Sequence, residues 1–86
     1  MKEFSYVIKD AEGIHARPAG ELVKLAKSFA PTTVTISKGV KSGNATKIFA
    51  VMGLGAKQGE TVTFRIEGEG EEAAAAELEK FMSENL

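Results

Sequence analysis

The chain has 86 residues, 43% of them apolar, and its 11 basic and 12 acidic side chains give a net charge of −1. This size allows one small domain over residues 1–86, and the balanced charge argues against a protein that binds nucleic acid through its phosphates. Because there is no cysteine and only one histidine, disulfides and cysteine nucleophiles are excluded, and imidazole chemistry has a single candidate.

The beginning of the chain predicts a strand followed by a helix. Residues 2–8 alternate between apolar and polar side chains, which is typical of a half-buried strand. Over residues 16–29 the apolar positions follow helical spacing instead, and Lys24 and Lys27 fall on the opposite face. Pro31 ends this helix, because the residue before a proline avoids the α region.

The middle of the chain predicts a hairpin and a short helix. Residues 33–37 are β-branched and alternating, and a tight turn over residues 38–39 leads to another strand over residues 40–42. Residues 48–52 are uniformly apolar and predict a short helix, with Thr46 as its cap. Since one helix face cannot bury all of them, some of these side chains must be exposed.

The end of the chain predicts a strand over residues 61–66 and a helix over residues 71–85. The element order is therefore β-α-β-β-α-β-α. A four-stranded antiparallel sheet covered on one face by three helices would bury every apolar stripe, so we expect an α+β fold of the open-faced β-sandwich type.

The candidate chemical site is the segment Gly-Ile-His-Ala-Arg-Pro-Ala over residues 13–19. If His15 caps the helix, its side chain lies near the unpaired N–H groups of Ala16 and Arg17, at a helix end that favours anions. The Arg17 guanidinium can bind phosphate oxygens, and a neutral imidazole there could accept a phosphoryl group and pass it on. A surface or capping histidine with no chemical role also fits this position.

This segment resembles the active-site signature of the HPr family, the histidine-containing phosphocarriers of the bacterial phosphoenolpyruvate–sugar phosphotransferase system. The chain length, the element order, the segment over residues 51–55 and the closing Glu/Ala-rich helix fit the family as well. The resemblance implies that enzyme I phosphorylates His15 on Nδ1, that Arg17 assists, and that IIA domains of sugar permeases receive the group. It implies a carrier rather than an enzyme, with no cofactor and no metal.

The resemblance also implies an apolar docking surface for these partners beside His15, with a basic rim. The residues implied are Ala16, Gly20, Lys24, Lys27, Ile48, Phe49 and Met52. Aromatic side chains and methionine are favoured at the centre of interfaces, and lysines can steer acidic partners. The alternatives are that the apolar residues belong to the core and that the two lysines are a solvated helix face.

The sequence departs from the family at two positions. Many relatives carry a regulatory serine just before the short helix, and here that position is Lys47, which a serine kinase cannot modify. Thr46 is the adjacent hydroxyl and the remaining candidate for regulatory phosphorylation. Gly20 replaces a larger residue within the first helix, at a cost of about 1 kcal/mol relative to alanine.

Two other kinds of protein remain to be considered. One is a regulatory module of the same fold that no longer carries phosphate, against which the presence of both His15 and Arg17 argues. The other is an RNA-binding domain that uses the glycine-rich residues 53–57, although the strands lack exposed aromatic pairs for stacking. No signal peptide or membrane span is visible, so we expect a cytoplasmic monomer that neither binds nucleic acid nor inserts into the membrane.

Overall fold

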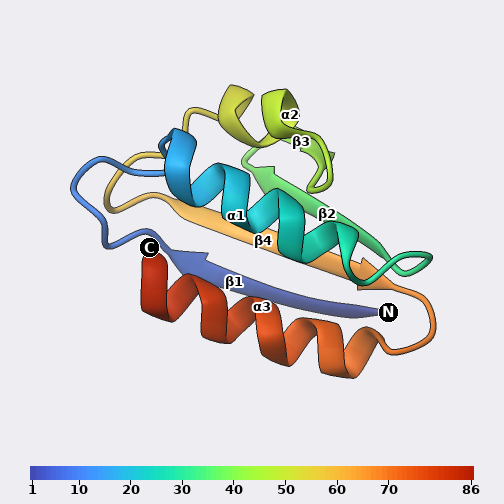
Figure 1. Ribbon diagram of the computed structural model, residues 1–86. Coiled ribbons are helices and arrows are strands. Elements are labelled where there is room, and N and C mark those ends of the chain that lie inside the picture. The colour runs from blue at the N-terminus through green and yellow to red at the C-terminus, as the bar shows by residue number, and fades with distance from the viewer.

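The computed structural model describes residues 1–86 and contains the predicted element order. The strands are β1 (Lys2–Val7), β2 (Thr33–Lys38), β3 (Lys41–Asn44) and β4 (Thr61–Glu67), and the helices are α1 (Ala16–Lys27), α2 (Ile48–Gly53) and α3 (Glu71–Asn85). All strand pairs are antiparallel in the order β1-β4-β2-β3, and the helices lie together on one side of the sheet (Figure 1). The predicted α+β fold is confirmed.

The centre of the sheet is β4, which pairs with β1 on one side and with β2 on the other. Its alternation places Val62, Phe64 and Ile66 on the helix-covered face, where all three are fully buried. The Phe4 ring of β1 stacks on Phe64 with ring centroids 5.0 Å apart. These residues form the floor of the core because successive strand side chains point to opposite faces.

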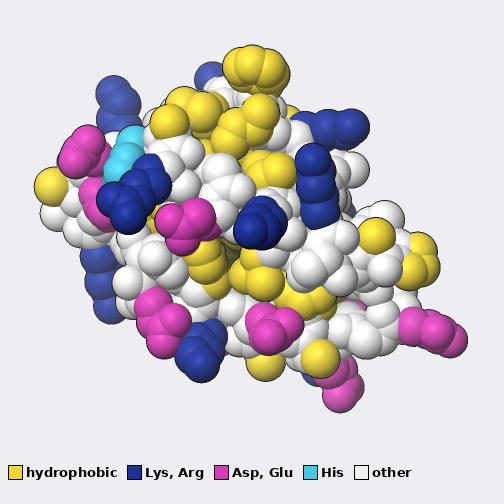
Figure 2. Space-filling model, viewed as in Figure 1, with side chains coloured by type: hydrophobic (Ala, Val, Ile, Leu, Met, Phe, Trp, Pro, Cys, Tyr) yellow, Lys and Arg dark blue, Asp and Glu magenta, His cyan; other side chains and the backbone are white.

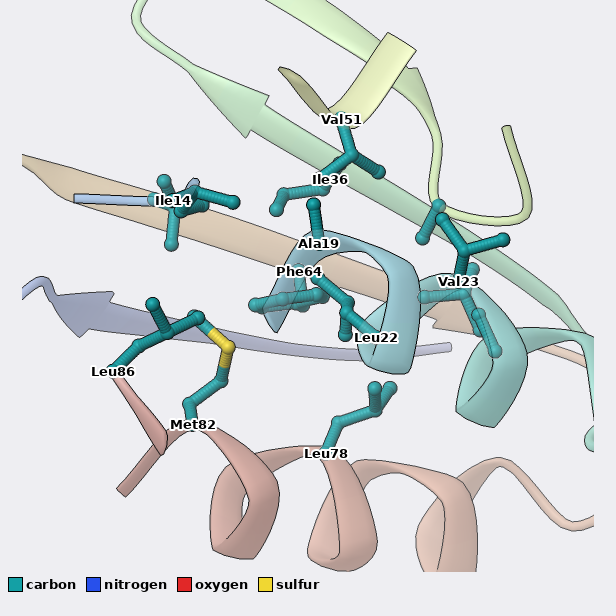
Figure 3. Packing of buried hydrophobic residues seen from close by; sticks show 14 of the residues in the cluster. Ile14, Ala19, Leu22, Val23, Ile36, Val51, Phe64, Leu78, Met82 and Leu86 are labelled. Carbon is teal, nitrogen blue, oxygen red and sulfur yellow. The ribbon is translucent and has the colours of Figure 1, made fainter. Parts of the chain in front are cut away.

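Helices α1 and α3 cover this face of the sheet and enclose the core. Leu22 of α1 and Leu78 and Met82 of α3 point inward toward Phe64 (Figure 3), and Val23 of α1 belongs to the same buried cluster. Each such buried side chain contributes roughly 1.5–3 kcal/mol through the hydrophobic effect. None of the three helices combines the length and the apolar character needed to cross a bilayer. This packing fixes the position of α1, and therefore of His15 at its start, relative to the sheet.

The largest differences from the predicted boundaries lie at the hairpin and at the end of α1, and the other elements differ by at most one residue. The strand expected over residues 40–42 is instead Lys41–Asn44, because Lys38 still pairs with Lys41 and the turn falls at Gly39 and Val40. Val40 is apolar, which suggested a strand, yet its side chain is fully exposed. Helix α1 ends at Lys27 rather than at residue 29, because the following backbone N–H groups turn back to carbonyls three residues earlier.

Candidate functional site

The backbone before His15 is held against the loop that follows α2. Gly13 has a φ of +69°, and a Cβ at this position would lie 2.3 Å from the Ala56 carbonyl oxygen and 2.9 Å from Lys57 Cα. The same carbonyl accepts a hydrogen bond of 3.0 Å from the N–H of Ile14, whose side chain is buried. Only glycine fits such a close approach with this backbone conformation, so Gly13 fixes where the next residues lie.

His15 is the N-cap of α1, as the sequence predicts. Its backbone is extended (φ −94°, ψ 177°), and its carbonyl accepts the first helical hydrogen bond from the N–H of Ala19 at 3.0 Å. The imidazole makes no cap hydrogen bond to the helix, so it does not occupy the N–H groups that a helix start leaves free. The side chain is therefore available for chemistry at the positive end of a 12-residue helix.

The structure adds Asp10 to the predicted site. Its Oδ2 lies 3.8 Å from His15 Nε2, while its Oδ1 accepts a hydrogen bond of 2.8 Å from the N–H of Glu12. The Asp10 carbonyl also accepts from the N–H of Gly13 at 2.9 Å, and its own N–H donates to the Leu86 carbonyl at 2.9 Å. The sequence shows an aspartate before a glycine, a turn signal, but not that the turn would aim one oxygen at the imidazole.

Arg17 lines, together with His15, a shallow hollow of about 220 Å³ with mostly polar and charged surroundings. The hollow is bordered by Asp10, His15, Arg17, Pro18, Glu21 and Asn85. The Arg17 side chain is 89% exposed, with its Nε 3.9 Å from Glu21 Oε1 one helical turn away. Figure 2 shows the single histidine, in cyan, at the surface beside dark blue and magenta side chains. Because it is largely exposed, the guanidinium could reach an anion at the start of α1.

The short helix α2 divides its apolar residues between the core and the surface. Val51 is fully buried and Ile48 packs partly against the core, whereas Phe49 is 86% exposed and Met52 is 39% exposed. The prediction that some of these side chains must be exposed is confirmed. Helix α2 packs against α1, and hydrophobic side chains gather over this part of the surface in Figure 2.

The other predicted partner-binding residues follow the outer face of α1. Ala16 and Gly20 are exposed near its start, and nothing lies within 4 Å of the place where a Gly20 Cβ would stand. Lys24 and Lys27 are exposed in the last turn, about 13 and 18 Å further along the helix axis than His15. The two lysines are therefore remote from the imidazole. Their positive charges also stabilise the negative, C-terminal end of the α1 dipole.

The prediction that Thr46 caps α2 is wrong. The N-cap is Lys47, and it makes no side-chain cap bond. The Thr46 hydroxyl and the Thr46 N–H both lie close to Asn44 Oδ1, at 2.7 and 2.9 Å, because Asn44 builds a local turn at the end of β3. The exposed Lys47 is thus the residue at the helix start, and the adjacent hydroxyl is bound elsewhere.

Comparisons with known proteins agree with this architecture. A family model described as the PTS HPr component phosphorylation site matches residues 2–84. The phosphocarrier protein HPr of Lysinibacillus sphaericus is 39% identical over 84 residues, which cover 98% of this chain and 94% of the relative. The HPr of Streptomyces coelicolor is 44% identical over 77 residues, which cover 88% of this chain and 82% of the relative.

A crystal structure of HPr from Thermoanaerobacter tengcongensis matches with a TM-score of 0.90 and 37% identity, over 96% of this chain and 92% of that one. Sequence and fold thus agree along nearly the whole length. The chain belongs to the HPr family, and it is a phosphocarrier of the phosphoenolpyruvate–sugar phosphotransferase system rather than an enzyme.

Proposed function

We propose that His15 accepts the phosphoryl group from enzyme I on Nδ1 and passes it to IIA domains of sugar permeases. The observation that supports this role is that His15 caps a 12-residue helix without using its side chain in a cap bond. Its Nε2 is turned toward Asp10, so Nδ1 is the nitrogen left for phosphorus. The free N–H groups of Ala16 and Arg17 and the Arg17 guanidinium would bind the phosphoryl oxygens.

The test is phosphorylation of the purified chain by phosphoenolpyruvate and enzyme I. We expect one phosphate per molecule by intact mass, labile in acid and stable in base, and none on a His15→Ala variant. Urea unfolding of that variant must first show that its fold is retained. Absence of phosphate on the wild-type chain, or equal uptake by His15→Ala, would contradict the assignment.

We propose that enzyme I and the IIA domains dock on the surface formed by α1 and α2. The exposed Phe49 and Met52 give this surface an apolar centre, and Ala16 and Gly20 leave it open toward His15. Ile48 packs partly on the core, while Lys24 and Lys27 form a basic rim. In an NMR titration with enzyme I, amide shifts should change on α1 and α2 and not on the exposed sheet face.

The remaining expectations rest on the same role. We propose that the carrier acts in the cytoplasm as a monomer and does not bind nucleic acid, which salt-sensitive retention on RNA would contradict. Phosphorylation of Thr46 would require its hydroxyl to leave Asn44, and Lys47 cannot take its place. A purely regulatory module of this fold would fail to restore sugar uptake in cells that lack their own carrier, whereas we expect this chain to restore it.

A further inference from the structure

We propose that Asp10 is a positioning residue for phosphoryl transfer: its Oδ2 fixes the proton of the neutral imidazole on Nε2 and stabilises the positive charge that the ring gains when Nδ1 attacks phosphorus. This inference rests on the proposed role of His15. The observation behind it is the 3.8 Å separation between Asp10 Oδ2 and His15 Nε2, with neither side chain fully exposed.

The two oxygens of the carboxylate have different tasks. Oδ1 accepts the N–H of Glu12 at 2.8 Å and holds the turn that leads to Gly13. The Asp10 backbone is fixed as well, since its N–H donates to Leu86 and its carbonyl accepts from Gly13. With the main chain and one oxygen held, Oδ2 is left facing Nε2, so the orientation does not depend on a freely rotating side chain.

A carboxylate on this side of the ring selects one tautomer. A neutral imidazole has one N–H, and the hydrogen is favoured on the nitrogen that faces the negative oxygen. With the hydrogen on Nε2, the lone pair is on Nδ1. The same logic operates where an aspartate holds a catalytic histidine in the tautomer required for its reaction.

The contribution of Asp10 grows along the reaction. The Nδ1 lone pair forms the bond to phosphorus, the bond between phosphorus and the donor atom breaks, and its electron pair leaves with the donor. The Nε2 proton stays in place, so the ring becomes cationic beside the carboxylate. An interaction that is stronger in the transition state than in the ground state increases the rate. Arg17 and Glu21 border the same hollow, but they carry opposite charges and lie close to each other. Asp10 is therefore the carboxylate that faces Nε2.

The key variant is Asp10→Asn, which keeps an oxygen for the Glu12 N–H and removes the charge. Glu12→Gln is the matched control, because it makes the same charge change in the same loop at an exposed side chain. We expect phosphoryl uptake from phosphorylated enzyme I to be about tenfold slower in Asp10→Asn than in Glu12→Gln. The reason is that the interaction energy of two charges about 4 Å apart near a protein surface is larger than in bulk water and smaller than in the protein interior.

The second measurement is the ¹⁵N spectrum of the His15 ring in the unphosphorylated protein, which does not depend on any partner. We expect the Nε2–H tautomer in the wild type and in Glu12→Gln, and a shift toward the Nδ1–H tautomer in Asp10→Asn. Equal uptake rates in the two variants, or an Nδ1–H tautomer in the wild type, would overturn the proposal. Failure of the wild type to accept phosphate, with the expected tautomer present, would instead count against the role of His15.

Discussion

Replacement of Gly13 by alanine tests whether the loop after α2 holds the site in place. The new Cβ would lie 2.3 Å from the Ala56 carbonyl oxygen, a backbone atom that cannot rotate away. Segment 13–14 must then move, and the hydrogen bond from Ile14 N–H to this carbonyl is strained or lost.

The expected loss of stability can be worked out from these contacts. Placing alanine at a φ of +69° costs about 1–2 kcal/mol, and leaving the buried partners of the Ile14 bond unsatisfied costs about 1–3 kcal/mol more. The sum of roughly 2–5 kcal/mol is a large part of the roughly 4–13 kcal/mol expected for a chain of 86 residues. We therefore expect a folded but clearly weakened variant.

Gly39→Ala is the matched control, because Gly39 has a φ of +60° and nothing lies within 4 Å of its Cβ position. It carries the backbone cost and the altered entropy of the unfolded chain, and these cancel in the comparison. In urea unfolding followed by circular dichroism, Gly13→Ala should lose about 1–3 kcal/mol more than Gly39→Ala. Equal losses in the two variants would refute the idea that the approach to Ala56 fixes the start of α1.

Three further predictions concern docking, the core and pH. Phe49→Ala should change the free energy of unfolding by less than about 0.5 kcal/mol while slowing phosphoryl transfer from enzyme I, and Val40→Ala, another exposed apolar residue, should slow nothing; equal rates would contradict the docking role. Phe64→Ala should cost about 3–5 kcal/mol in urea unfolding, and a loss below about 1 kcal/mol would contradict its central place in the core. The Lys57 backbone N–H, followed by Lys38, lowers the pKa of Glu60 in the folded protein. As pH falls, the unfolded state therefore binds this proton at a higher pH than the folded state does. The stability contributed by the ionised Glu60 carboxylate is lost as pH falls through its lowered pKa. Glu60→Gln should therefore show a smaller loss of stability on acidification than the wild type, and identical pH profiles would contradict this pairing.

Much of the fold could be predicted from periodicity. Residues 61–66 alternate cleanly and lie in the central strand, and the helix over Glu71–Asn85 has the predicted bounds. Patterns succeed there because both elements bury one regular face against the core. The error at Val40 has the opposite origin: an apolar residue suggested a strand, but the glycine before it adopts a positive φ and makes the turn.

The site was predictable only where its residues are adjacent in sequence. His15 and Arg17 share one motif at a helix start, so local rules place them correctly. The contact between Asp10 and the imidazole depends on how a loop turns, and the contact between Gly13 and Ala56 joins segments 43 residues apart. The role of Asn44 was missed for a related reason, since its side chain captured the Thr46 hydroxyl that the helix was expected to use.

The absent cap bond at His15 has a consequence for the phosphorylated form of the carrier. A good N-cap side chain contributes about 0.5–2 kcal/mol to its helix, and His15 leaves that contribution unrealised. A phosphoryl group on the ring would supply the missing acceptor for the first-turn amides. The loaded and unloaded carriers would then differ in how firmly the start of α1 is ordered. A partner that binds this first turn of α1 could therefore distinguish the phosphorylated carrier from the unphosphorylated one by the order of the turn.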